Sequence, residues 1–359
     1  MSFGLNLARS LALLILITSS CRSVDRGISP ISAKATRAHL TVVKSAQVAT
    51  HSKAIAAIAF DQTSNRIFSV DTEGHLRARS LLDQKVKDID ALGNLSLGAT
   101  RFFYSKWLAT SQGSAFGVPS NMPGFQIWDL ETGSLLTELT KTIPTKLSAI
   151  ALNLTGTLLF GVGSGGYSAY EVKTKTEVFA AAWSEGDSNI SQFDVVDIDR
   201  DGKYAASVNA SGSVWVFPIN LNKRYWERVS EMRVAPPVVR NQWSEKTLQP
   251  LAIAFDPTRN WLVVVFNDKL AFYSLKDFRK TFETDFAIGG KAAAIAFGND
   301  GSVVAIGSEG GWQLWGVEGN RLIVEDRSTP TFALAFSPDG RYFATGDAQG
   351  TVQQYDVHQ

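Results

Sequence analysis

One short pattern recurs along most of this chain, and it limits the possible fold more than any other feature. Residues 332–340 read FALAFSPDG and residues 293–301 read AAIAFGNDG, while LAIAFD at 251–256 and AAIAFD at 56–61 repeat the first part. Looser copies, SAIALNLTG and VVDIDRDG, end at Gly156 and Gly202. Each copy is a short apolar run closed by turn residues, which predicts a β-strand followed by a tight turn.

The spacing of these copies indicates the kind of repeat. The last apolar residue of each strand is Phe60, Leu152, Ile198, Phe255, Phe297 or Phe336. Successive copies stand 39 to 57 residues apart, except for one interval of 92 residues that accommodates two repeats. The copy missing from that interval is expected around 102–109, where Phe102, Phe103 and Trp107 form strand-like runs. A period of about 40 to 45 residues is typical of propeller blades. The sequence therefore predicts an all-β fold, a seven-bladed β-propeller of four-stranded antiparallel blades over residues 39–359.

The second half of each repeat carries a polar turn and a strand that ends in an aromatic residue. The turns are clearest at 70–74, 307–310 and 346–350, and the aromatic residues are Trp128, Tyr170, Phe217, Tyr273, Trp315 and Tyr355. At Trp128-Asp129, and nearly so at Tyr355-Asp356, the chain resembles the WD-repeat family, whose third strands end in Trp-Asp. The resemblance covers about nine-tenths of the chain and implies a rigid platform that binds other proteins.

Most repeats depart from that family because they lack the histidine and aspartate that tie each blade together. Only the first repeat has candidates for both, His51 before its first strand and Asp71 in its tight turn. For His51 we favour the role of a hydrogen-bonded strut over that of a ligand or base. A different propeller family with similar strand spacing stays open.

The end of the chain indicates how the ring closes. The last repeat stops after its third strand, at residues 355–359, and so lacks a fourth. Residues 40–48, LTVVKSAQV, precede the first repeat and are rich in β-formers. We expect this N-terminal strand to pair into the last blade and to remove its open edge.

Composition excludes some classes of partner. The chain has 35 basic and 34 acidic side chains and a formal net charge of +1, so no strong positive field is available for nucleic acid. We expect a monomeric propeller that does not bind nucleic acid.

The N-terminus has the layout of an export signal. Arg9 precedes the apolar run Leu11–Ile17, and Thr18-Ser19-Ser20 stands directly before Cys21, the one cysteine of the chain. The apolar run is much shorter than the ~20 residues that a membrane-spanning helix needs. Residues 1–20 are therefore interpreted as a signal peptide.

The same segment resembles a bacterial lipoprotein signal, in which small residues precede a cysteine that becomes lipidated. The resemblance implies lipidation of Cys21, a flexible tether over 21–38, and an exported lipoprotein held at a membrane of the cell envelope, on its periplasmic or extracellular face. Ordinary signal cleavage nearby and a membrane-retained N-terminus stay open as alternatives.

Residues for catalysis, cofactors or metals are scarce. The four histidines, at positions 39, 51, 75 and 358, stand apart in the sequence, and no nucleophile or phosphate-binding motif accompanies them. The acidic run Asp197–Gly202 suggests a calcium loop, but Ala205 and Val208 occupy positions where such loops need carboxylates. The sequence thus predicts no enzyme, no cofactor and no metal site.

Two segments exceed the repeat length, and insertions in propellers commonly decorate a binding face. Residues 112–126 are expected to join the second and third strands of the second blade, and residues 235–249 to join the fourth blade to the fifth. Phe116, Met122, Arg240 and Trp243 are residue types enriched in interface cores, and we assign them to a partner-binding rim. Each could instead cap its own blade.

Two functions follow from these features. The first is a non-catalytic protein-interaction scaffold, tethered to the membrane, whose protein partner belongs to the cell envelope. The alternative is a propeller enzyme or a carrier of a small ligand or ion that uses the central channel. We favour the first, because the expected channel-lining strands read AIAF and ALAF and offer few groups for acid-base chemistry.

Overall fold

The computed structural model describes part of the chain. The described residues are 40–61, 63–83, 85–89, 115–119, 124–129, 135–140, 147–153, 157–163, 166–174, 176–182, 193–209, 214–219, 232–233, 251–258, 261–266, 269–277, 279–285, 288–290, 292–317 and 321–358. The chain divides into two units, Met1–Ala38 and His39–Gln359, and all described residues belong to the second. All regular secondary structure among the described residues is β-strand.

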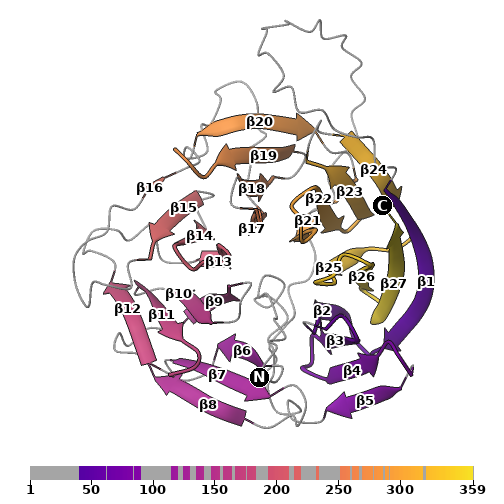
Figure 1. Ribbon diagram of the computed structural model, residues 1–359, viewed down its shortest axis with the longest axis horizontal. Coiled ribbons are helices and arrows are strands. Elements are labelled where there is room, and N and C mark those ends of the chain that lie inside the picture. The colour runs from indigo at the N-terminus through magenta and orange to yellow at the C-terminus, as the bar shows by residue number, and fades with distance from the viewer. Residues whose placement is uncertain are drawn as a thin grey trace, which may run out of the picture. The chain divides into compact units, whose positions relative to one another are not determined.

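The strands form antiparallel sheets (Figure 1). In every sheet except the last, the neighbouring strands follow one another along the chain. The first sheet contains β2 (Ile55–Phe60), β3 (Arg66–Asp71), β4 (Leu76–Ser80) and β5 (Val86–Ile89). The second has three described strands, β6 (Ala115–Pro119), β7 (Gly124–Asp129) and β8 (Leu135–Thr140). The third contains β9 (Leu147–Leu152), β10 (Leu158–Gly163), β11 (Gly166–Glu171) and β12 (Thr176–Ala182), and the fourth β13 (Phe193–Ile198), β14 (Tyr204–Asn209), β15 (Val214–Pro218) and β16 (Met232–Arg233).

The remaining sheets follow the same order. The fifth contains β17 (Ala252–Phe255), β18 (Trp261–Val265), β19 (Lys269–Ser274) and β20 (Lys280–Asp285). The sixth contains β21 (Ala292–Phe297), β22 (Val303–Ser308), β23 (Gly311–Gly316) and β24 (Arg321–Asp326). The last sheet combines β25 (Thr331–Phe336), β26 (Tyr342–Asp347) and β27 (Thr351–His358) with the N-terminal strand β1 (Thr41–Thr50).

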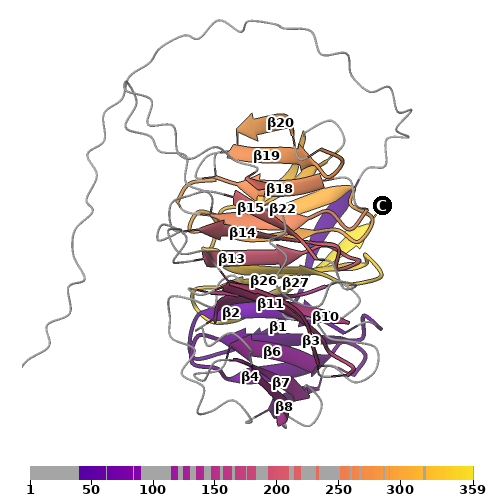
Figure 2. The ribbon, with the colours of Figure 1, turned by 90° about the vertical axis from the view of Figure 1, so that its left-hand side faces the viewer.

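Neighbouring sheets contact one another through their first strands. Strand β25 lies against β2 on one side and β21 on the other, and the contacts continue from β21 to β17, β13 and β9, which in turn contacts β6 of the three-stranded sheet. Figure 1 shows these first strands around a common centre, and Figure 2 shows that strands such as β13 run roughly along the axis of the ring. This arrangement of four-stranded antiparallel blades is a β-propeller.

The strand boundaries confirm the repeat seen in the sequence. The six residues expected to end the first strands are the last residues of β2, β9, β13, β17, β21 and β25. The polar turns expected at 70–74, 307–310 and 346–350 fall between β3 and β4, β22 and β23, and β26 and β27. Alternating apolar runs and turn residues therefore located both elements correctly.

A buried polar residue follows most of these first strands and shapes the next turn. These residues are Asp61, Asn153, Asp199, Asp256 and Ser337, each at most 4% exposed. Each side-chain oxygen accepts backbone N–H groups of its own turn, as Asp61 Oδ1 does from Asn65 at 2.8 Å and from Arg66 at 3.0 Å. A buried N–H without a partner is unfavourable, so these side chains stabilise the tight turns that the repeat requires.

The number of complete blades differs from the expectation. The described residues form six four-stranded sheets, whereas the sequence predicts seven. The difference lies in the β6–β8 sheet, which has three described strands. Residues 102–109, expected to provide its first strand, lie outside the described residues. The spacing of the turns indicates how many repeats the chain has. It does not establish that each repeat forms a sheet of four paired strands.

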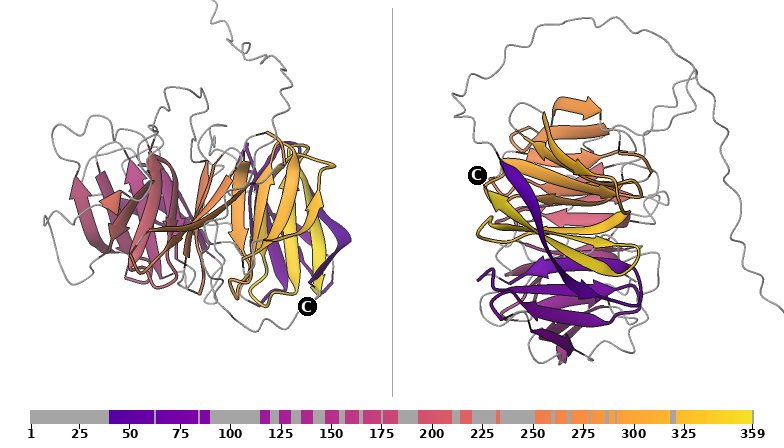
Figure 3. Two further views of the ribbon diagram at one scale, coloured as in Figure 1. Left: turned by 90° about the horizontal axis from the view of Figure 1, so that it is seen from above. Right: turned by 90° about the vertical axis from the view of Figure 1, so that its right-hand side faces the viewer.

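The N-terminal strand β1 pairs with the third strand of the last repeat. Its register runs antiparallel from Thr41 opposite His358 to Thr50 opposite Thr351, with irregularities between Lys44 and Ala46 and between Gln47 and Ala49. Figure 3 shows β1, in indigo, crossing the outside of the last sheet. The segment 40–48 thus forms the strand that the sequence predicts, shifted by one or two residues at its ends.

The two halves of β1 pack into different cores. Leu40 and Val42 contact the cluster that contains Trp312 of β23 and Phe343 of β26. Val48 and Ala49 belong to another cluster, which contains Ile55 and Ile58 of the first sheet. The strand therefore joins the last sheet to both of its neighbours.

Candidate functional site

The residues assigned to a partner-binding rim lie mostly outside the described part of the chain. This holds for Met122, Arg240 and Trp243, and for the lipidation candidate Cys21. Phe116 is described and lies in β6, opposite Trp128 of β7.

The position of Phe116 corrects one expectation. Residues 112–126 were expected to form one long connection, but they include β6 (Ala115–Pro119) and the first residues of β7. The connection between these strands is 120–123, which still contains Met122. The error arose because glycine and proline, taken as loop signals, also occur inside edge strands and at strand ends.

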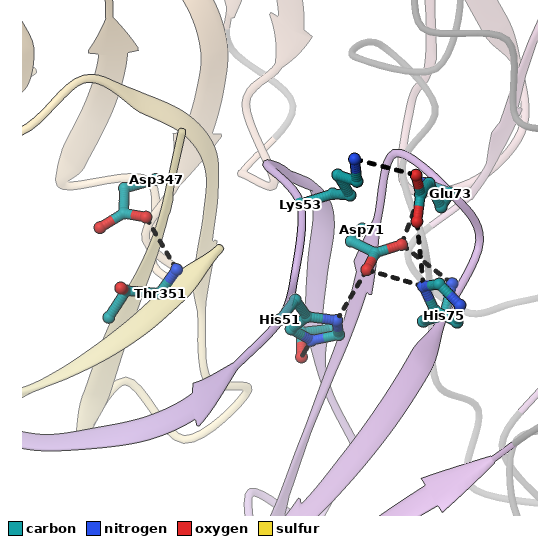
Figure 4. A network of polar contacts seen from close by, with 8 residues as sticks. His51, Lys53, Asp71, Glu73, His75, Asp347 and Thr351 are labelled. Carbon is teal, nitrogen blue, oxygen red and sulfur yellow. Dashed lines mark hydrogen bonds and ion pairs between the residues drawn. The ribbon is translucent and has the colours of Figure 1, made fainter. Parts of the chain in front are cut away.

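The best-defined polar site surrounds Asp71 at the end of β3 (Figure 4). His51, in the connection from β1 to β2, hydrogen-bonds through Nε2 to Ser69 Oγ at 2.7 Å, and its Nδ1 faces Asp71 Oδ2 at 3.5 Å. The His51 backbone N–H donates to the carbonyl of Gly350 in the last sheet, at 2.7 Å. His51 therefore ties the connection before β2 to strand β3 and to the neighbouring last sheet, as a structural strut does.

Asp71 also organises the turn that follows it. Its Oδ1 accepts the backbone N–H groups of Glu73 and His75, both at 3.0 Å, and its Oδ2 lies 3.0 Å from His75 Nδ1. On the outer side of the turn, Lys53 Nζ pairs with Glu73 Oε1 at 3.2 Å. The side chains of Lys53, Glu73 and His75 are about half exposed, whereas that of Asp71 has no exposed surface.

The surroundings of Asp71 favour its charged form. Burial by itself would raise the pKa of Asp71, but hydrogen bonds from His51 and from the backbone and side chain of His75 outweigh it and lower the pKa to about 2. The carboxylate is therefore ionised throughout the physiological range and holds its donors by charge-assisted hydrogen bonds.

Ser69, His51 and Asp71 are connected in the order of a Ser-His-Asp catalytic triad. All three side chains are buried, however, so they cannot act on a substrate as a catalytic triad does. Ser69 is 3% exposed, and the side chains of His51 and Asp71 have no exposed surface. A triad must present its hydroxyl oxygen to a substrate. The geometry thus confirms the structural role predicted for His51. The sequence analysis did not single out Ser69, although it stands two residues before Asp71 and so on the same face of β3.

The pKa of Asp71 gives a testable pH dependence. Its ordinary value is 3.8 and its value in the fold is about 2, so the ionised carboxylate stabilises the protein above pH 4. We expect this contribution, about 2 kcal/mol, to be lost as the pH falls from about 4 to about 2. Urea unfolding of the wild type and Asp71→Asn at several pH values measures it, because the variant should lack this part of the loss. The matched control is Asp285→Asn, whose carboxylate is 85% exposed. An acid-induced loss as large in Asp71→Asn as in the wild type would assign the effect to other groups.

The acidic run at 197–202 uses its carboxylates separately. Asp197 Oδ2 accepts the backbone N–H of Phe255 in the next sheet at 2.7 Å, and Asp199 Oδ1 accepts that of Tyr204 at 2.8 Å. Asp201 pairs with Lys203 at 3.7 Å. Burial, together with the nearby charges of Asp201 and Asp197, raises the pKa of Asp199. These contacts shape a turn and join two sheets. Among the described residues, no three His, Cys, Asp or Glu side chains are grouped as a metal site would require.

None of the described residues forms a helix of the length and apolar character that crossing a bilayer requires.

Comparison with known families agrees with the blade architecture. The family model described as "WD domain, G-beta repeat" matches residues 326–356. The match begins at the last residue of β24, includes β25 and β26, and ends within β27. A search of curated proteins found no match to this chain. Propellers of the WD-repeat type generally act as protein-interaction scaffolds and are typically not catalytic. The chain thus forms a β-propeller of four-stranded antiparallel blades, and its last repeat matches the WD-repeat family.

Proposed function

We propose that this protein is a membrane-tethered, non-catalytic scaffold of the cell envelope that holds other proteins on one face of its propeller. The observation that carries the proposal is the WD repeat at 326–356 within a ring of four-stranded blades. The burial of the Ser69–His51–Asp71 network is consistent with it, because the polar chemistry of the first blade is used to hold strands together.

The proposal includes a closed, seven-bladed ring. In this proposal the β6–β8 sheet, with its three described strands, counts as the seventh blade. The pairing of β1 with β27 supports closure by the N-terminal strand, because it provides a fourth strand to a sheet whose other three come from the end of the chain.

Tethering rests on the sequence of the N-terminus. Residues 1–20 are removed as a signal peptide, Cys21 is lipidated, and residues 21–38 connect the lipid to the propeller. Each buried methylene of an acyl chain contributes about 0.8 kcal/mol of membrane affinity, so lipidation would hold the protein at a bilayer without a spanning helix.

Partner binding is assigned to the connections 120–123 and 235–249. The first joins the second strand of a blade to the third, and the second leads from β16 at the end of one sheet to β17 at the start of the next. Since strands alternate in direction, both kinds of connection leave the same face of the ring. Met122, Arg240 and Trp243 lie on these connections and have the character of interface anchors.

Affinity purification from detergent-solubilised membranes tests both parts of the proposal. We expect Trp243→Ala to lose proteins that the wild type retains, with an unchanged melting temperature, because a central aromatic anchor commonly contributes about 2 kcal/mol or more to binding. Cys21→Ser should leave the membrane fraction and fail to incorporate a clickable fatty acid. A melting temperature lowered by several degrees with the same bound proteins would make Trp243 a core residue and refute the rim. Equal labelling of Cys21→Ser and the wild type would refute the tether.

A further inference from the structure

Arg79 occupies a position that aromatic residues fill in the other repeats. It is the fifth residue after Gly74 of the β3–β4 turn, as Tyr355 is after Gly350 and Trp315 after Gly310. The same slot holds Trp128, Tyr170, Phe217 and Tyr273 in the remaining repeats. A charged side chain at a position that others use for aromatic packing calls for a specific set of contacts.

The contacts of Arg79 reach out of its own sheet. Its Nη1 donates to the backbone carbonyls of Gln47 at 3.0 Å and of Val48 at 2.6 Å, both in β1. By comparison, Tyr170 donates to Glu177 on the outer strand of its own sheet, at 3.0 Å. Arg79 therefore connects the third strand of the first sheet to the N-terminal strand, which belongs to the last sheet.

The two acceptors lie where the pairing of β1 is irregular. Gln47 stands opposite Gln353 and Ala49 opposite Val352, so Val48 has no residue opposite it in the register. A bulge of this kind takes backbone groups out of the ladder. The guanidinium of Arg79 supplies donors to that place, and a hydrogen bond from a charged donor is stronger than one from a neutral amide.

The side chain of Val48 strengthens the same junction. It is fully buried in the cluster that includes Ile55, Ile58 and Ile67 of the first sheet. Arg79 fixes the backbone of Val48, and the side chain of Val48 packs between the two sheets. We propose that Arg79 is the positioning residue that locks β1 across the seam between the last and the first sheet, and that the ring opens at β1 when this lock is removed.

Hydrogen exchange measured by mass spectrometry tests the lock in the intact chain. In Arg79→Gln we expect the amides of Thr41–Ala49 to exchange roughly tenfold faster or more, since two hydrogen bonds from a charged donor are lost. Amides of β17, β18 and β19, on another part of the ring, should keep wild-type rates. Arg79→Lys, which keeps one charged donor, should give an intermediate acceleration. Lys85→Gln is the matched control, because it removes a positive charge from an 83% exposed position just beyond β4.

Arg79→Tyr guards against a variant that simply fails to fold. It introduces a residue type that the same slot holds in three other repeats, so it should fold and still release β1. Wild-type exchange of β1 in either Arg79→Gln or Arg79→Tyr would overturn the proposal. Equal acceleration in every sheet, or loss of folding in all Arg79 variants, would also overturn it, because a lock confined to β1 leaves the other sheets formed.

Discussion

Removal of residues 39–48 should abolish cooperative folding of the propeller or destabilise it by several kcal/mol. The deletion takes away most of β1, whose Val48 is fully buried, and also Leu40, which packs with Val42 against a second core. Full burial of a side chain such as Val48 contributes about 1.5 to 3 kcal/mol, against a total stability of about 5 to 15 kcal/mol for a typical domain. The loss also exposes the edge of β27, which favours aggregation.

The matched control for this deletion is removal of residues 22–38. We expect that variant to melt like the wild type, because the segment precedes β1 and its composition predicts a tether. Thermal unfolding followed by circular dichroism, with light scattering to detect aggregation, compares the two. If both truncated proteins melt at the wild-type temperature, β1 contributes little to the ring and the closure assignment is wrong.

The second large effect is expected for Gly350→Ala, in the turn between β26 and β27. Gly350 has a φ of +83°, and a Cβ built on it would overlap the carbonyl oxygen of His51 and lie 2.6 Å from that of Lys53. These neighbours are backbone atoms of the connection that leads into the first sheet, so the last sheet and this connection would have to separate. We expect a loss of about 3 kcal/mol or more, combining left-handed strain of about 1 to 2 kcal/mol with overpacking of about 1 to 3 kcal/mol.

Gly340→Ala separates the two contributions. Gly340 has a φ of +72°, yet a Cβ there would meet no atom within 4 Å. Its substitution should therefore destabilise by about 1 kcal/mol through backbone strain alone. Urea unfolding of the two variants and the wild type measures both values. An equal loss of unfolding free energy in the two variants would show that close packing of Gly350 against the backbone of His51 adds nothing to the cost of the substitution.

Much of the fold was accessible from the sequence because its causes are local. Alternating apolar residues and polar turns located the first strands to the residue, as with Phe255 and Phe297. The strut role of His51 was expected from the resemblance to WD repeats, and its contacts with Ser69 and Asp71 agree with it. The prediction of one long connection at 112–126 was wrong, because Phe116 belongs to strand β6.

What the sequence determined by itself is the repeat of short strands and tight turns. Those features follow from side-chain alternation and turn chemistry within a few neighbouring residues. Only the tertiary structure decided which distant atoms meet at the seam. The pairing of Arg79 with the carbonyls at the Val48 bulge joins positions about 30 residues apart in the sequence, and Gly350 meets His51 across nearly the whole chain. Such contacts depend on the register of β1 and the twist of two sheets, which no local pattern encodes.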